Sequence, residues 1–82
     1  MKITLKLYGK LDKYLPENAS RNQAEVEIEE SSSVERALDD YGITSDQCHL
    51  VMVNGVYVKP EERATQVLSE SDNLAVWPPS TG

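Results

Sequence analysis

The sequence contains a single cysteine, Cys48, among 82 residues. One thiol cannot form an intrachain disulfide framework, and it supplies too few ligands for an iron-sulfur cluster or a cysteine-based zinc site. No apolar run approaches the roughly 18 residues that span a bilayer, and the N-terminus lacks the apolar core of a signal peptide. We therefore expect a cytoplasmic protein without redox chemistry of its own and without a metal or a stably bound cofactor.

Basic residues are also few. Lys and Arg number 8 against 14 Asp and Glu, which gives a formal net charge of −6. This charge disfavours nucleic acid and anionic membranes as partners, and it fits a basic partner surface better. Hydrophobic residues make up 39% of the chain, which is enough for one small core. We expect one folded domain.

Alternating apolar and polar residues predict strands at residues 2–8 and 25–29. Their inward side chains would be Ile3, Leu5, Leu7, Val26 and Ile28. Between them, residues 11–15 have apolar spacing for one or two helical turns, and residues 17–23 form a polar linker.

Residues 32–42 carry the clearest helix pattern. Ser32 and Glu35 have capping-box spacing, and Gly42 follows as a left-handed stop. The apolar stripe of this helix consists of Val34, Ala37, Leu38 and Tyr41. Residues 43–49 then connect the helix to the next apolar run.

Two groups of polar residues invite a catalytic interpretation. Glu25, Glu27 and Glu29 form a row of carboxylates, but acid-base pairs need a shielded site that separates their pKa values, so we interpret the row as a solvated strand face. Cys48 and His49 are adjacent, but no second cysteine or histidine completes a relay or a metal site. We assign neither group a chemical role.

Residues 50–58 give the strongest local signal. Asn54 and Gly55 supply the two positive φ values of a type I′ turn between β-branched runs, which predicts a two-residue hairpin and its register. Since sides alternate along each strand, Met52 and Tyr57 share one face. The other face, predicted to meet the core, carries Val51, Val53, Val56 and Val58.

The C-terminal residues predict a strand that stops abruptly. Leu74 and Val76 alternate with outward positions, and two prolines then remove consecutive backbone donors, so sheet pairing cannot continue. Before this strand, Val67 and Leu68 are expected to cover an edge of the core. We expect a folded domain at 1–77 and a flexible tail at 78–82 that reaches roughly 17 Å. The tail consists of Pro78, Pro79, Ser80, Thr81 and Gly82.

The predicted order of elements is strand, strand, helix, strand, strand, connection, strand. If the first and last strands pair in parallel, four or five strands can wrap one face around the apolar stripe of the helix. This predicts an α+β fold of the ubiquitin-like β-grasp type, with a mixed four- to five-stranded sheet packed on one main helix.

The sheet face opposite the helix is predicted to be rich in large side chains. By parity, Tyr8, Met52, Tyr57 and Trp77 all point away from the helix. Trp, Tyr and Met are enriched in the cores of protein interfaces, so we interpret the four residues as a partner-docking face. The alternative is a scatter of ordinary surface aromatics.

The order of elements, the Val-Asn-Gly hairpin at 53–55, the approach at 68–72 and the ending Val-Trp-Pro-Pro-Ser-Thr-Gly resemble the molybdopterin synthase small subunit family of ubiquitin-like sulfur carriers. The resemblance covers the whole chain, and its specificity depends mainly on the Pro-Pro pair. Thiamine-type sulfur carriers also end in glycine, but they are typically shorter before the helix and lack this pair.

The resemblance implies a role as a carrier rather than as an enzyme. An ATP-dependent activating enzyme would adenylate the terminal carboxylate of Gly82, and a sulfur donor would convert it to a thiocarboxylate. The molybdopterin synthase large subunit would then use the sulfur to build the dithiolene that holds molybdenum or tungsten. The catalytic groups would belong to these partners.

The tail departs from the family pattern in one respect. The family usually has Pro-Pro, two variable residues and then Gly-Gly, and in that register Gly82 matches the penultimate glycine. Either the chain is one residue short of the working form, or it is not charged in the usual way. Two other functions remain open: a ubiquitin-like modifier joined to lysines, and a β-grasp interaction module that is never charged.

Overall fold

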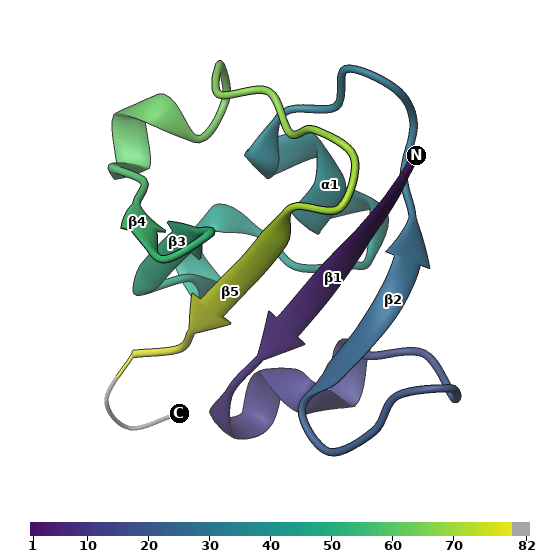
Figure 1. Cartoon of the computed structure of the whole chain (residues 1–82). Helices are drawn as coiled ribbons and strands as arrows, with labels where there is room; N and C mark the ends of the chain where they lie inside the picture. Colours follow the sequence, from purple (N-terminus) through teal and green to yellow (C-terminus); the bar gives the residue numbers. More distant parts are fainter. Residues whose placement is uncertain (80–82) are drawn as a thin grey trace.

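The alternating residues at the start of the chain form strand β1 (Lys2–Leu7), which lies within one mixed sheet (Figure 1). The computed structural model describes residues 1–79. Within them, the other strands are β2 (Gln23–Glu27), β3 (Leu50–Val53), β4 (Val56–Tyr57) and β5 (Asn73–Trp77). The α-helix is α1 (Val34–Asp40), and three 3-10 helices are η1 (Gly9–Tyr14), η2 (Ser45–Gln47) and η3 (Pro60–Glu62).

The strand order of the sheet is β2-β1-β5-β3-β4. β1 pairs with β5 in parallel, with Leu5 opposite Leu74, and the other neighbouring strands pair antiparallel. The long connection between β1 and β5 includes α1, which lies across one face of the sheet (Figure 1). The predicted α+β fold of the β-grasp type is confirmed, with five strands in the described part of the chain.

The sheet face that meets α1 carries the core. Buried side chains from the sheet, α1 and the connecting segments form one hydrophobic cluster. A fully buried Val, Leu or Ile side chain contributes about 1.5–3 kcal/mol, so this cluster is the main source of stability. Its members are Ile3, Leu5, Leu7, Leu11, Ala24, Val26, Ile28, Val34, Ala37, Leu38, Ile43, Cys48, Val51, Val53, Val58, Leu68, Leu74 and Val76. Tyr41 is only partly buried at the end of the helix, where its hydroxyl donates to the Glu27 carbonyl at 3.0 Å.

The prediction of burial is wrong for two residues, Val56 and Val67. Val56 is 66% exposed because β4 is a two-residue edge strand and Val56 directly follows the hairpin turn, where no further strand covers it. Val67 is 54% exposed, whereas its neighbour Leu68 is buried. Val67 makes an isolated bridge with Ser33, and in this extended backbone neighbouring side chains point to opposite sides.

The helix begins one residue later than the predicted capping box implies. The N-cap is Ser33, whose hydroxyl oxygen accepts from the Arg36 backbone N–H at 3.1 Å. Ser32 instead donates its hydroxyl to the Glu29 carbonyl at 2.7 Å and is buried. The predicted stop is confirmed, since Gly42 has a φ of 85°.

The predicted hairpin and its register are confirmed. Asn54 and Gly55 have φ values of 53° and 81°, and Val53 pairs with Val56 across the turn. The Asn54 side chain also bonds to the start of β5 and to the residue before it. Its Nδ2 donates to Asp72 at 2.8 Å, and its Oδ1 accepts from the Asn73 backbone N–H at 2.8 Å.

Strand β5 ends at Trp77, directly before Pro78 and Pro79, as predicted. The rest of the predicted tail, Ser80, Thr81 and Gly82, lies outside the described residues. The predicted flexibility of these residues therefore stays a prediction. None of the helices within residues 1–79 is long and apolar enough to cross a membrane.

Candidate docking face and tail exit

The strand register brings the predicted docking residues onto one sheet face. Met52 lies opposite Tyr57 on one side and Ala75 on the other, so these residues form a row across β4, β3 and β5. Trp77 pairs with Leu50 in the next row towards the end of β5. Val51, Val53 and Val76 alternate with these residues along the strands and are buried on the face that meets α1. The two rows therefore lie on the opposite face of the sheet.

Tyr8 and Trp77 stack on each other where β1 and β5 end. Their ring centroids are 4.4 Å apart and their planes differ by 5°. Backbone bonds fix both positions: the Tyr8 N–H donates to the Val76 carbonyl at 3.1 Å, and the His49 N–H donates to the Trp77 carbonyl at 2.8 Å. The stacked pair therefore lies where the chain leaves the sheet, directly before Pro78. We call this point the tail exit.

Leu50 and Ala75 also belong to this face, although the sequence analysis did not assign them to it. Both are partly buried and lie between the predicted aromatic residues. The same parity that places Met52 and Trp77 would have placed them there. We define the docking face as Tyr8, Leu50, Met52, Tyr57, Ala75 and Trp77.

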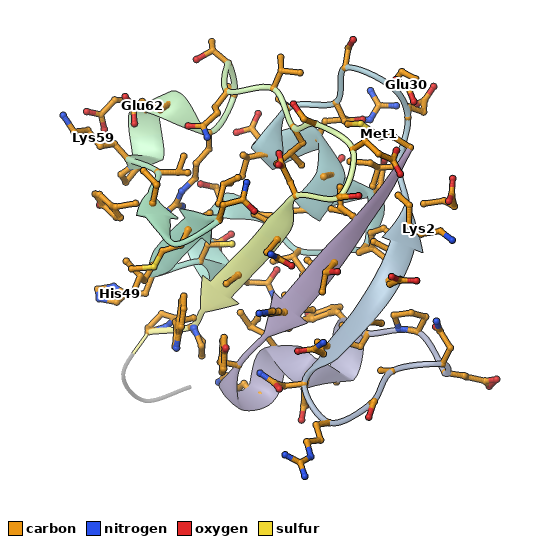
Figure 2. The ribbon with its side chains drawn as sticks, viewed as in Figure 1. Met1, Lys2, Glu30, His49, Lys59 and Glu62 are labelled. Atoms are coloured by element: carbon orange, nitrogen blue, oxygen red, sulfur yellow. The ribbon has the colours of Figure 1, made fainter. Side chains whose placement is uncertain are left out.

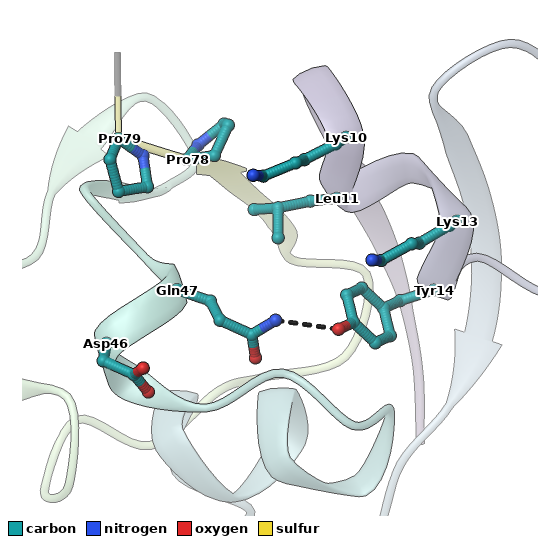
Figure 3. A pocket seen from close by; sticks show the side chains of 8 residues that line it. All are labelled: Lys10, Leu11, Lys13, Tyr14, Asp46, Gln47, Pro78 and Pro79. Carbon is teal, nitrogen blue, oxygen red and sulfur yellow. Dashed lines mark hydrogen bonds between the residues drawn. The ribbon is translucent and has the colours of Figure 1, made fainter. Parts of the chain in front are cut away.

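A pocket of about 200 Å³ adjoins the tail exit, and the sequence analysis missed it (Figure 3). Lys10, Leu11, Lys13 and Tyr14 line it from η1, Asp46 and Gln47 from η2, and Pro78 and Pro79 from the chain after β5. Gln47 Nε2 donates to the Tyr14 hydroxyl at 2.8 Å, which joins η1 to η2. No local sequence signal reports this pocket, because its three walls come from segments far apart in the chain.

The carboxylates of β2 and the following loop remain solvated, as the sequence interpretation proposed. Glu25, Glu27 and Glu29 are all exposed. Glu27 lies 3.8 Å from the N-terminal ammonium, and Glu29 lies 3.3 Å from the Arg36 guanidinium. Figure 2 shows Met1 beside Glu30, another partner of the N-terminus at 3.3 Å, far from His49 and the tail exit.

Cys48 and His49 do not form a chemical pair. Cys48 is buried, and burial raises the pKa of its thiol, an effect that Arg63 opposes and Asp46 reinforces. His49 is exposed and points away from the molecule (Figure 2). Among the described residues, no group of three His, Cys, Asp or Glu is arranged to hold a metal ion.

Arg63 is the unexpected polar residue of the interior. It is only 3% exposed, and its Nη1 donates to the Cys48 carbonyl at 3.3 Å. No acceptor in the described part of the chain contacts its Nε or Nη2. Arg63 therefore anchors the residues between η2 and β3, next to the His49 amide that binds Trp77.

The strand order, the one α-helix among residues 1–79 and the parallel pairing of β1 with β5 define a ubiquitin-like protein of the β-grasp fold. The chain belongs to the Mut7-C ubiquitin family, whose model matches residues 1–81. No curated protein matches the sequence significantly.

Solved structures with the same fold include SAMP1 from Haloferax volcanii, at 22% identity and a TM-score of 0.68, covering 100% of this chain and 99% of that chain. A second structure, of H. volcanii small archaeal modifier protein 1, has 20% identity and a TM-score of 0.67, with 95% and 97% coverage. Molybdopterin converting factor subunit 1 from Pyrococcus furiosus has 19% identity and a TM-score of 0.68, with the same coverage. At these identities the likeness shows the fold, and it confirms at that level the resemblance to ubiquitin-like sulfur carriers.

Proposed function

We propose that this protein is a sulfur carrier that is adenylated and then thiocarboxylated at its C-terminal glycine, and that it donates this sulfur in the biosynthesis of the molybdenum or tungsten cofactor. The observation that carries the proposal is the position of the Tyr8 and Trp77 stack. A partly exposed aromatic face ends at Trp77, directly before Pro78 and Pro79, so a protein that binds this face is placed to receive the chain that follows.

The chemistry requires activation of the tail by a partner. A free α-carboxylate has a pKa of about 3.3–3.7, so it is ionised at pH 7 and is a poor electrophile. Attack of the carboxylate on the α-phosphate of ATP releases pyrophosphate and gives an acyl adenylate. Sulfide from a sulfur donor then adds to the acyl carbon and displaces AMP, which leaves a thiocarboxylate. This chain supplies the carboxylate and the docking face, and the partner supplies the catalytic groups and uses the ATP.

Two partners follow from this scheme. The first is an E1-like ATP-dependent activating enzyme that holds the docking face and the tail. The second is a molybdopterin synthase large subunit that takes the sulfur; the name of the Pyrococcus protein makes it one subunit of a converting factor. Because charging consumes ATP, we propose that it takes place in the cytoplasm.

The test is a charging reaction with the chain extended by one glycine after Gly82, the activating enzyme encoded in the same genome, ATP and sulfide. We expect pyrophosphate release and a product in which one oxygen of the terminal carboxylate is replaced by sulfur, as measured by intact-mass spectrometry. A tail changed from Pro-Pro-Ser-Thr-Gly to end in alanine is the control and should give neither product. Pyrophosphate release without incorporation of sulfur would reject the carrier function.

A protein modifier is the second candidate, because two of the matching structures are of a small archaeal modifier protein. A modifier shares the adenylation step, but its acyl group passes to a lysine amine instead of to sulfur. Mass spectrometry of proteins from the native cells separates the two functions. Lysine-linked remnants of the tail would support the modifier, and a free thiocarboxylate would support the carrier.

A further inference from the structure

The pocket beside the tail exit is positively charged, although the molecule as a whole is acidic. Its walls carry the ammonium groups of Lys10 and Lys13 and one carboxylate, Asp46. Two positive charges and one negative charge give a local sum of +1, against −6 for the chain. Within residues 1–79, neither lysine has a carboxylate within ion-pair distance, since the N-terminus and Arg36 form the ion pairs found there.

The base of the pocket is apolar and fixed. Leu11 is buried, with 2% of its surface exposed, and the rings of Tyr14, Pro78 and Pro79 surround it (Figure 3). Three contacts hold Tyr14 in place. Gln47 donates to its hydroxyl, Lys13 Nζ lies 5.4 Å from its ring centroid, and Gly42 lies so near that a Cβ added there would be 3.5 Å from the ring.

Asp46 does not neutralise the lysines. Its carboxylate accepts a hydrogen bond from the Thr44 hydroxyl, and Figure 3 shows it on the η2 side, away from Lys10 and Lys13. The site therefore presents two cations on one wall above an apolar base. This combination matches an acidic side chain next to an apolar one, because the carboxylate meets the ammonium groups while the apolar neighbour covers Leu11 and the proline rings.

We propose that this pocket binds an acidic segment, a carboxylate next to a leucine-like side chain, on the protein that takes the tail. The inference builds on the proposed function, since the occupant is placed by Pro78 and Pro79, where the chain leaves the sheet. Pro78 and Pro79 are a wall of the pocket and also the start of the tail, and Trp77 joins them to the docking face. A partner that covers the docking face and receives the chain after Pro79 therefore lies next to this pocket.

The first arm tests the pocket without any partner. The probes are two capped peptides, acetyl-Asp-Leu-Glu-Leu-amide and its neutral analogue acetyl-Asn-Leu-Gln-Leu-amide, titrated into the nitrogen-15-labelled full chain. We expect the acidic peptide to shift the backbone amide signals of Leu11, Tyr14 and Gln47 with a Kd on the order of 1 mM, and the neutral peptide to bind about fivefold more weakly or not at all. Equal shifts from both peptides would overturn the charge-based inference.

The matched variants separate the pocket from the net charge. Lys10→Glu/Lys13→Glu reverses the two pocket charges, and Lys2→Glu/Arg21→Glu makes the same change in net charge outside the pocket lining. All four residues are exposed, so both variants should keep the amide spectrum of the core. The pocket variant should lose the shifts produced by the acidic peptide, and the control variant should keep them. Retention of these shifts in the pocket variant would contradict the proposal.

The second arm uses the activating enzyme of the proposed function. We expect Lys10→Glu/Lys13→Glu to weaken binding of the enzyme about tenfold at low salt, and less at high salt, whereas the control variant changes it by less than about twofold. Equal weakening by both variants would reject the pocket as a contact of this partner. If the enzyme does not bind the unaltered chain, the proposed function fails, and the peptide arm still decides whether the pocket binds acidic segments.

Discussion

At the scale of single residues, the stacked rings of Tyr8 and Trp77 have two roles. A stacked aromatic pair contributes about 0.5–1.5 kcal/mol beyond the area that it buries, so the pair stabilises the junction of β1 and β5. Both residues are only partly buried, so the same rings remain open to a partner. Tyr57 lies at the other side of the face and is 48% exposed, which makes it the cleaner probe of binding alone.

We expect Tyr57→Lys to weaken binding of the activating enzyme by more than about 2 kcal/mol, as the loss of an interface anchor should. Because Tyr57 is exposed, this substitution should change the free energy of unfolding of the protein by less than about 0.5 kcal/mol. Trp77→Lys should weaken binding equally but also cost about 1 kcal/mol of stability, because the stack is lost. Calorimetric titration and urea denaturation measure the two effects.

The control for these variants is Val56→Lys, which makes the same kind of substitution next to Tyr57 on the other face of β4. Val56 is 66% exposed and should tolerate lysine without loss of binding. Unchanged binding in both Tyr57→Lys and Trp77→Lys would reject the docking face.

Arg63 offers a prediction about stability. Its guanidinium is 3% exposed and makes a single hydrogen bond to a protein group, at 3.3 Å, in the described residues. The desolvation penalty of a buried charge often exceeds what one hydrogen bond returns, and well-packed apolar replacements are often neutral or stabilising. We therefore expect Arg63→Met to raise the free energy of unfolding by about 1 kcal/mol. Urea denaturation measures this change.

The control is Arg63→Ala, which removes the same charge but leaves a cavity, and it should lower the free energy of unfolding by about 2 kcal/mol or more. A loss of stability in the methionine variant would mean that solvent or a neighbouring carboxylate satisfies Nε and Nη2 in solution.

At the scale of elements, the hairpin of β3 and β4 positions Met52 and Tyr57 on the docking face. The turn needs glycine at position 55 for its backbone conformation, since φ there is 81°. It does not need glycine for space, because a Cβ added there would have no atom within 4 Å. Its other central residue, Asn54, tolerates a positive φ and bonds to Asp72, directly before β5, and to Asn73, the first residue of β5. The turn therefore fixes both the register of the hairpin and its place in the sheet.

We expect Gly55→Ala to lower the free energy of unfolding by about 1 kcal/mol, because an L residue with a side chain is strained in the left-handed region. Gly55→Asn should cost less, since asparagine adopts that region more readily. Thermal or urea denaturation gives both values. If alanine and asparagine were equally destabilising, loss of the left-handed conformation would not be the cause.

At the scale of the whole molecule, the proposed charging depends on the reach of the tail. An activating enzyme must hold the carboxylate in line with the α-phosphate of ATP, and a misplacement of about 1 Å can cost on the order of a hundredfold in rate. One residue of extended chain spans roughly 3.5 Å. In the family register, a carboxylate on Gly82 lies one residue short of that position.

We therefore expect a chain that ends at Gly82 to release pyrophosphate very slowly with its activating enzyme, and a chain extended by one glycine to be adenylated and converted to thiocarboxylate. Binding should be equal, because the docking face is the same in both forms. Pyrophosphate release at matched concentrations measures the difference. Equal rates would make Gly82 the working terminus and the register argument wrong.

Much of the fold could be predicted from local patterns in the sequence. The alternation in β1, the Asn54 and Gly55 turn and the prolines after Trp77 are short-range signals, and each forms the element that it predicts. Parity along the strands also placed Tyr8, Met52, Tyr57 and Trp77 on one face. These features follow from backbone geometry, which acts over only a few residues, so the sequence by itself determined them.

Only the tertiary structure decided which distant residues meet. The stacking of Tyr8 on Trp77, the pocket between η1, η2 and Pro78, and the burial of Arg63 each join segments that no local pattern relates. The exposure of Val56 has the same origin, because its parity is inward but the edge of the sheet leaves it uncovered. Periodicity states which way a side chain points, whereas burial and contact depend on what the rest of the chain places there.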